Sequence, residues 1–261
     1  QMLFGTSVVF GEIRSAGTLG NPNLLAIFLV LTIPCLIYAV ENQLIPKIKG
    51  RAILVALLIG IICTVSRKGI VTAILAFALY YYFKKEFKKL FVLGIVVMIL
   101  TIVLSGYAII SERFSQESLN KQLSNKWAMT FAGLQMYKTS PIIGLGWKGY
   151  YDNYGKYFPW SGREKYDSHN IFITALANYG IIGFIPFLGI FLYPLLLAWR
   201  TFRNEHIQNS NNIQKDLSII CLSSIILFMV NGWFAGGLFY NPVIILLLYT
   251  NILIFLSLSE N

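Results

Sequence analysis

Charged residues are scarce in this chain. Only 12% of its 261 residues are Asp, Glu, Lys or Arg, while 56% are hydrophobic and the mean hydropathy is +0.66. A soluble globular domain has roughly a quarter of its residues charged. The scarcity therefore excludes an ordinary soluble domain and predicts an all-α polytopic membrane protein.

Carboxylates are absent from every long apolar run of the sequence. Intramembrane carboxylates are the usual relay of ion-coupled transporters, and a buried divalent metal needs several carboxylate or imidazole ligands. Cysteine is also rare: Cys35, Cys63 and Cys221 all lie in apolar runs and show no Cys-x-x-Cys spacing. We therefore expect no ion-coupled transport, no disulfide framework, no metal and no other cofactor.

Basic residues outnumber acidic ones, which gives a formal net charge of +10. These charges lie mostly in short loops between apolar runs. Such a distribution is better explained by orientation in the bilayer, and by anionic lipid or phosphate partners, than by nucleic acid. Membrane lipids are thus expected partners, and nucleic acid is not.

Seven apolar runs predict seven transmembrane helices. The runs are Leu24–Val40, Ala52–Val65, Gly69–Phe83, Leu90–Ile110, Ile181–Trp199, Leu217–Phe234 and Val243–Leu258. The whole stretch 171–199 exceeds the roughly 20 residues of a straight span, and Gly180 and Gly183 divide it. A short surface helix, His169–Tyr179, is expected before the fifth span.

We expect one membrane domain over residues 1–261. Because the chain opens on Gln1 without an initiator methionine, we also expect it to be truncated at its N-terminus. Lys and Arg cluster in the turns Glu41–Arg51, Lys84–Lys89 and Arg200–Asp216, which the positive-inside rule makes cytoplasmic. A large loop at residues 111–168 then faces outward from the cytoplasmic (inner) membrane, together with His169.

The outer loop contains its own helical pattern. Ser124 is placed to cap a helix that Pro141 stops, and apolar residues recur at helical spacing between them: Trp127, Phe131, Leu134 and Tyr137. We expect an amphipathic helix lying on the membrane or across the mouth of the bundle. Tyr150 and its aromatic neighbours suit sugar faces, and they suit an interfacial aromatic belt equally well.

Arg67 and Lys68 lie at a hairpin tip between the second and third runs. A guanidinium can clamp a phosphate with two hydrogen bonds, and the neighbouring ammonium adds a point charge. Interfacial anchoring by snorkelling is the structural alternative. Asn21 and Asn23 precede the first span, where they could start the helix or contact a ligand.

His169 stands where the polar loop meets an apolar run, and the chain has only two histidines. An imidazole can transfer a proton near neutral pH, with Asp167 to hold it and Asn170 to add an amide. A helix-start histidine bonded to the backbone is the structural alternative. His206, in a cytoplasmic turn, is expected to be solvated and uninvolved.

Four short motifs, in this order, resemble the O-antigen ligase and O-antigen polymerase family of bacterial membrane glycosyltransferases. They are Gly17–Ala26, Ser66–Gly69, Pro141–Gly146 and Ser168–Asn170, the last followed by a short helix ending in Tyr179–Gly183. The resemblance covers roughly residues 15–200. Family members usually carry further spans upstream of the first motif.

The resemblance implies a lipid-sugar glycosyltransferase-type bundle that uses an undecaprenyl-diphosphate-linked glycan as donor at the outer leaflet. Arginines engage the diphosphate in such enzymes and a histidine is the proposed base, without a metal; Arg67 and His169 match those motifs. Attack opposite the leaving phosphate would invert the anomeric centre. Substrate contacts are expected from residues near these motifs, namely Asn21, Asn23, Tyr150, Asp167 and Asn170.

One departure from the family pattern concerns the second phosphate-binding cation. Members often carry an arginine just before a tryptophan in the outer loop, where this chain has Lys126 before Trp127. We expect Lys126 to substitute as a point charge or Arg113 to reach in, although lysine and arginine are not equivalent at such a site.

Three classes of function remain open. We expect a surface-polysaccharide polymerase, for which a chain-length regulator would be a protein partner, with ligation to a lipid A core or to protein as alternatives. A lipid-linked glycan transporter would bind the diphosphate without chemistry. A non-catalytic partner in envelope assembly is the third class, and no sequence feature supports it.

Overall fold

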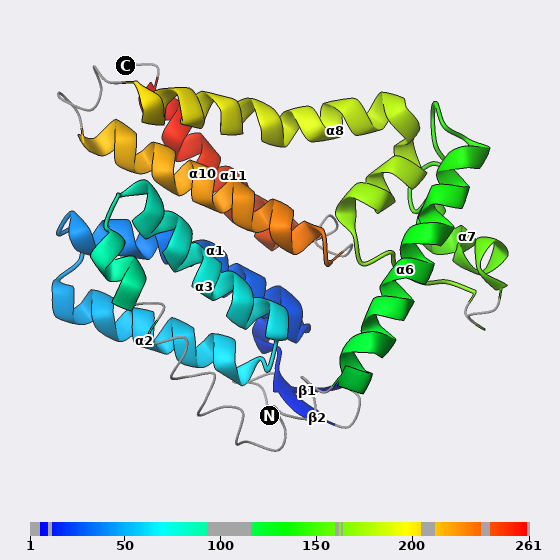
Figure 1. Ribbon diagram of the computed structural model, residues 1–261, viewed down its shortest axis with the longest axis horizontal. Helices are drawn as coiled ribbons and strands as arrows, with labels where there is room; N and C mark the ends of the chain where they lie inside the picture. The colour runs from blue at the N-terminus through cyan, green and yellow to red at the C-terminus, as the bar shows by residue number, and fades with distance from the viewer. Residues whose placement is uncertain are drawn as a thin grey trace. The chain divides into compact units, whose positions relative to one another are not determined.

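The computed structural model consists mainly of helices (Figure 1). It describes residues 6–9, 12–92, 95, 116–159, 162, 164–204, 212–235 and 241–259. The predicted span Leu90–Ile110 lies largely outside these residues, and so do Arg113 and His206. The chain divides into two compact units, which are described separately. Unit 1 comprises Gln1–Leu93, Tyr193–Asn231 and Pro242–Asn261, and unit 2 comprises Gly94–Leu192 and Gly232–Asn241.

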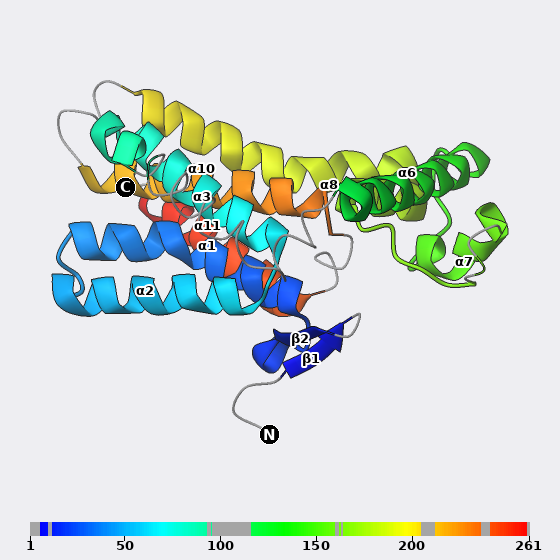
Figure 2. The same cartoon turned by 60° about the horizontal axis from the view of Figure 1, so that its bottom comes forward.

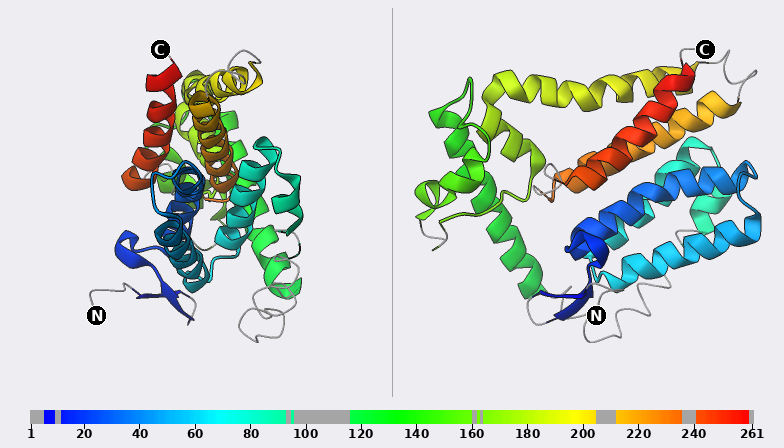
Figure 3. Two further views of the ribbon diagram at one scale, coloured as in Figure 1. Left: turned by 90° about the vertical axis from the view of Figure 1, so that its left-hand side faces the viewer. Right: turned by 180° about the vertical axis from the view of Figure 1, so that it is seen from behind.

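Unit 1 is a helical bundle centred on α1. Its helices include α1 (Pro22–Glu41), α2 (Lys47–Cys63), α3 (Arg67–Phe83), most of α10 (Asn212–Gly232) and α11 (Pro242–Ser259), and the last part of α8 (Ile171–Arg203) also belongs to it. Helix α1 packs along α2 and α3 and also contacts α11 (Figure 1), which leaves Ile27, Leu31 and Ile33 with no exposed surface. Helices α10 and α11 lie side by side (Figure 3), and Asn251 Nδ2 of α11 donates to Ser224 Oγ of α10 at 2.9 Å.

Three of the described helices are long and apolar enough to cross a membrane: α1, α8 (Ile171–Arg203) and residues 213–232 of α10. Helices α2 and α3 have 17 residues each, which spans about 25 Å against a hydrocarbon core of about 30 Å. The helical membrane class is therefore confirmed. The count of seven spans remains a prediction.

A small β-hairpin precedes α1 and was not predicted. Strands β1 (Thr6–Val9) and β2 (Glu12–Ser15) pair antiparallel, with Thr6 opposite Ser15 (Figure 2). A single 3₁₀ turn, η1 (Gly17–Leu19), then leads into α1. Strands of four residues are too short to show a reliable alternation of apolar and polar positions, so periodicity could not indicate them.

Unit 2 contains α6 (Gln116–Thr139), α7 (Gly149–Tyr157) and the first part of α8. The prediction that Ser124 caps the first of these helices is wrong, because α6 begins at Gln116 and Ser124 lies inside it. Residues 116–123 include good helix formers, and Leu119 and Leu123 continue the helical spacing of Trp127 towards the N-terminus, so the pattern extends past Ser124. The helix ends at Thr139, just ahead of Pro141 as predicted.

Helix α8 is broken at Gly180, whose backbone (φ 58°, ψ −163°) is not helical. The break confirms the predicted division into a short helix and a longer one. The short helix begins at Ile171, two residues later than predicted, so His169 precedes it.

Candidate functional site

The hairpin tip that carries Arg67 and Lys68 is joined to the start of α1. Ser66 caps α3: its Oγ accepts from the backbone N–H of Gly69 at 3.2 Å and donates to Asn23 Oδ1 at 3.0 Å. Ser66 is buried, whereas Arg67 and Lys68 are half-buried. The bond brings two motifs that are distant in sequence together within unit 1, and it places both cations in the first turn of α3.

Gly69 allows the two helices to approach closely. A Cβ atom at this position would lie 2.6 Å from the Cβ of Ala26, which is fully buried in α1. Asn21 caps α1 in turn, because its Oδ1 accepts from the backbone N–H of Asn23 at 2.9 Å. The amide oxygens of Asn21 and Asn23 thus have structural roles, and their predicted contact with substrate is not tested by this geometry.

His169 is presented by a hydrogen-bonded turn at the start of α8. Its own backbone is left-handed (φ 52°) and its side chain is exposed, with the imidazole edge-on to the Tyr166 ring at 5.6 Å between centroids. The residues on both sides of it, Ser168 and Asn170, are buried. The turn therefore projects the histidine outward from a fixed base.

Asn170 and Ser168 hold this turn. Asn170 Oδ1 accepts from the backbone N–H groups of Phe172 and Ile173, at 2.9 and 3.2 Å. The Ser168 hydroxyl donates to the Asn170 carbonyl at 2.7 Å and also bonds to the Thr174 hydroxyl. Because the Asn170 amide oxygen caps the helix, the structure gives this residue a positioning role, in addition to the substrate contact predicted for it.

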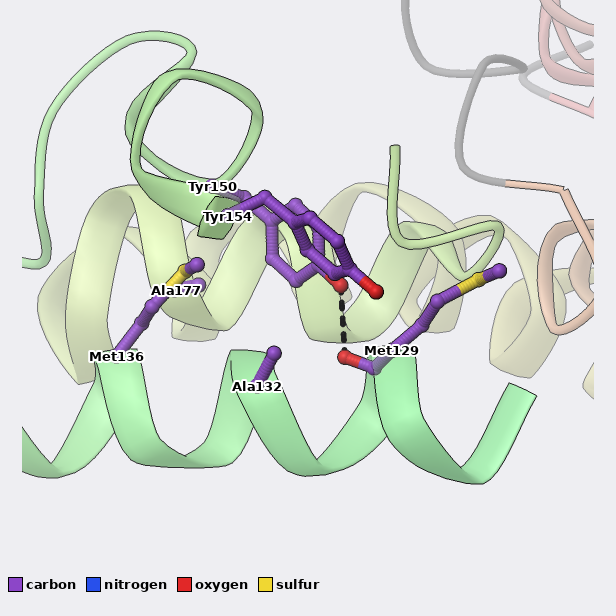
Figure 4. Packing of buried hydrophobic residues seen from close by; sticks show 6 residues of the cluster. All are labelled: Met129, Ala132, Met136, Tyr150, Tyr154 and Ala177. Carbon is purple, nitrogen blue, oxygen red and sulfur yellow. Dashed lines mark hydrogen bonds between the residues drawn. The ribbon is translucent and has the colours of Figure 1, made fainter. Parts of the chain in front are cut away.

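Tyr150 has a role in packing that its sequence context did not reveal. Its ring is 1% exposed, and its hydroxyl donates to the Met129 carbonyl at 2.7 Å (Figure 4). Burial raises the pKa of this phenol, and the charges of Tyr154 and Asp167 add to the effect. Asp167 and Tyr150 are thus close, and both line an open pocket in unit 2.

Unit 2 has a compact core, and Tyr166, whose ring contacts His169, packs against it. The core joins α6, α7 and the short part of α8 through buried residues: Met129, Ala132, Met136, Tyr150, Tyr154 and Ala177 (Figure 4). The predicted apolar stripe of α6 lies elsewhere, since Trp127 is 74% exposed and Phe131 is 51% exposed. The stripe is available to a membrane surface, as expected of an amphipathic helix.

The loop Pro141–Gly146 docks backbone to backbone against the break in α8. The N–H groups of Leu145 and Gly146 donate to the carbonyls of Ala177 and Asn178, at 2.9 and 2.8 Å. On the far side of the break, Ile181 N–H donates to the Pro141 carbonyl at 2.9 Å. The loop therefore satisfies backbone groups that the break at Gly180 removes from the helix.

Asn178 is a site-building residue that was not predicted. It has no exposed surface, and its Oδ1 accepts from the backbone N–H of Tyr150 at 2.7 Å, which anchors the first turn of α7. Its place inside an apolar run, two residues before Gly180, is the signal that could have indicated it. An asparagine inside an apolar run requires a hydrogen-bond partner.

Lys126 lies beside the turn that follows α10. Its ammonium is 4.4 Å from the centre of the Phe234 ring, and the adjacent Trp233 contacts Phe172 of α8 at 5.8 Å between ring centroids. Lys126, this turn and the first turn of α8 therefore belong to one part of unit 2. The cation is held by an aromatic face, which favours a fixed ammonium position.

Among the described residues, no three His, Cys, Asp or Glu side chains converge where they could hold a metal ion. The predicted site residues that the structure describes are divided between the two units. Arg67, Lys68, Asn21 and Asn23 belong to unit 1, and Lys126, Tyr150, Asp167, His169 and Asn170 belong to unit 2.

A comparison with protein families gives a match. The family model described as O-antigen ligase matches residues 52–188, just over half of the chain, and this stretch includes Arg67, Lys126 and His169. No curated protein matches the chain.

Proposed function

Because the chain belongs to the O-antigen ligase family, a family of membrane glycosyltransferases, we propose that it transfers a glycan from an undecaprenyl-diphosphate donor to a sugar hydroxyl. The reaction would take place at the outer face of the cytoplasmic membrane. The observation that carries the proposal is the exposed imidazole of His169. The backbone of His169 is left-handed, and its neighbours Ser168 and Asn170 are buried and hold the turn.

In the proposed step, His169 accepts the proton of the acceptor hydroxyl while its oxygen attacks the anomeric carbon of the donor. The bond from that carbon to the phosphate oxygen breaks, and undecaprenyl diphosphate leaves with the electron pair, so the anomeric centre is inverted. Arg67 and Lys68 would neutralise the developing charge on the diphosphate, with Lys126 or Arg113 as the further cation. No metal is required in this mechanism.

We propose a surface-polysaccharide polymerase, in which the acceptor is another lipid-linked glycan. Ligation to a lipid A core or to a protein uses the same donor chemistry and differs only in the acceptor. A transporter of lipid-linked glycan would need the cations but no base. The exposed and fixed imidazole favours an enzyme over a transporter.

The test is glycan formation by purified protein supplied with a lipid-linked donor and acceptor. His169→Gly removes the base and at the same time relieves the left-handed backbone, so the variant should fold while its turnover falls about 10²–10⁴-fold. Arg67→Lys keeps the charge but loses two-pronged phosphate binding, and should also lose activity. Lys156→Gln, on the exposed face of α7, is the matched control.

Three results would contradict the proposal. Full activity in His169→Gly would remove the base from the mechanism. Loss of activity in chelator, restored by a divalent ion, would overturn metal independence. Donor movement across a membrane without any new glycosidic bond would favour the transporter.

A further inference from the structure

An open pocket lies beside the His169 turn, and none of the residues that line it has a role in the bond-making step proposed above. Its volume is about 340 Å³ and it lies wholly in unit 2. Its lining residues are Lys148, Tyr150, Tyr151, Asp167 and Thr174. Helix α7 supplies the two tyrosines, the segment before His169 supplies Asp167, and the first turn of α8 supplies Thr174.

The floor of the pocket is rigid. Tyr150 and Thr174 are 1% and 2% exposed, and both side chains are hydrogen-bonded. Thr174 Oγ1 lies 2.9 Å from the Asn170 carbonyl oxygen and donates to the Ser168 hydroxyl, which itself donates to that carbonyl. The hydrogen bonds that hold the turn around His169 therefore also fix Thr174, so a molecule in the pocket would lie close to this turn.

The rim carries three different chemical groups. Lys148 and Tyr151 are exposed, and Asp167 is half-buried. A carboxylate accepts hydrogen bonds from sugar hydroxyls, a tyrosine ring packs on the apolar face of a pyranose, and an ammonium binds an anionic substituent. Asp167 supplies the carboxylate of the pocket lining. Asp152, the carboxylate of α7, is paired with Lys165 at 2.9 Å.

Lys148 is held in a backbone conformation that is unfavourable for lysine. Its φ is 59°, in the left-handed region that a glycine would occupy at lower cost. Its ammonium makes no hydrogen bond or ion pair within the described part of the chain. Lys148 therefore places an ammonium group on the pocket rim, where it can bind an anionic group.

We propose that this pocket binds the acceptor saccharide and that Lys148 selects a sugar bearing a carboxylate, as in a hexuronic acid. The proposal rests on the proposed glycosyltransferase function, to which it adds the chemical class of the acceptor. Asp167 would accept from ring hydroxyls, Tyr151 would cover one sugar face, and the carboxylate would pair with Lys148.

Saturation-transfer NMR on the purified full chain tests the pocket without requiring turnover. The probes are methyl glucuronide and its neutral counterpart, methyl glucoside. We expect wild type to favour the glucuronide about fivefold, as one ion pair allows. In Lys148→Gly and Lys148→Asn, which both tolerate left-handed backbone, this preference should disappear. Asp167→Asn should weaken both sugars, and Lys156→Gln should change neither.

Equal binding of the two sugars by wild type, or a glucuronide preference that survives both Lys148 variants, would overturn the proposal. Two variants are used so that a folding defect in one does not decide the result. His169→Gly should bind glucuronide normally. If it does so while wild type forms no glycan, the proposed glycosyltransferase function is wrong, and the proposal that the pocket binds a saccharide is still supported. Glycan formation without glucuronide binding would instead refute the pocket and leave the glycosyltransferase function in place.

Discussion

Gly180 and Gly144 are the two residues on which the geometry of unit 2 most depends. A Cβ at Gly180 would lie 2.4 Å from the backbone of Ile142, and a Cβ at Gly144 would lie 2.4 Å from the backbone of Asn178. Both residues also have positive φ. Two backbones meet here with no room for a side chain, so each glycine is required twice, for its conformation and for the contact.

Gly180→Ala should destabilise the protein by more than about 2 kcal/mol, because it adds left-handed strain to a clash with backbone that cannot move away cheaply. Gly189→Ala, later in the same helix, is the control: nothing lies within 4 Å of its Cβ position and its φ is not positive. That change should be neutral or stabilise by about 0.5–1 kcal/mol. Thermal unfolding in detergent measures both, and equal midpoints would contradict the prediction.

At the scale of elements, a network of charges joins α1, α3 and α10 in unit 1. Lys84 lies just after α3, and its Nζ pairs with Asp216 of α10 at 2.5 Å and with Glu41 of α1 at 4.0 Å. Tyr80, which is fully buried, donates to Glu41 at 3.0 Å. The Asp216 side chain is only 7% exposed, so the network depends on Lys84 to compensate a charge that has little access to water.

Lys84→Met should cost about 3 kcal/mol, because it leaves the Asp216 carboxylate buried without its cation. Lys89→Met removes a lysine that also pairs with Glu41, at 3.1 Å, but is 49% exposed. An exposed pair contributes only about 0–1 kcal/mol. The difference between the two unfolding midpoints is the measurement, and a loss for Lys84→Met no larger than that for Lys89→Met would show that Asp216 does not depend on Lys84.

Helix α6 shows what periodicity can and cannot predict about an element. The recurrence of Trp127 and Phe131 correctly predicted a helix, and Pro141 correctly predicted its end. The same pattern could not show that Met129, Ala132 and Met136 form the face that packs into unit 2, while the aromatic stripe remains exposed. The helix has two apolar faces, and only contacts with other elements distinguish them.

For the whole molecule, the positive-inside rule predicts which loops face the cytoplasm. The turn at residues 84–89 should be cytoplasmic, and α7 should be outside. Lys85 and Lys156 are both exposed, so a cysteine at either position would be accessible from its own side.

In a Cys63→Ala background, Lys156→Cys should react with a membrane-impermeant maleimide in intact cells. Lys85→Cys should react only after the membrane is permeabilised. The background without an added cysteine measures labelling of Cys35 and Cys221, which are half-buried and fully buried. Labelling of Lys85→Cys in intact cells, with Lys156→Cys protected, would reverse the predicted orientation.

The sequence by itself determined the helical membrane class, the break at Gly180 and the family, because composition, apolar runs and short motifs are properties of neighbouring residues. Only the tertiary structure decided that the loop Pro141–Gly146 completes the broken helix, and that Ser66 bonds to Asn23. It also revealed the structural roles of Asn178 and Tyr150. These contacts join segments that are distant along the chain, and their hydrogen bonds depend on how the backbone folds back, which no local pattern records.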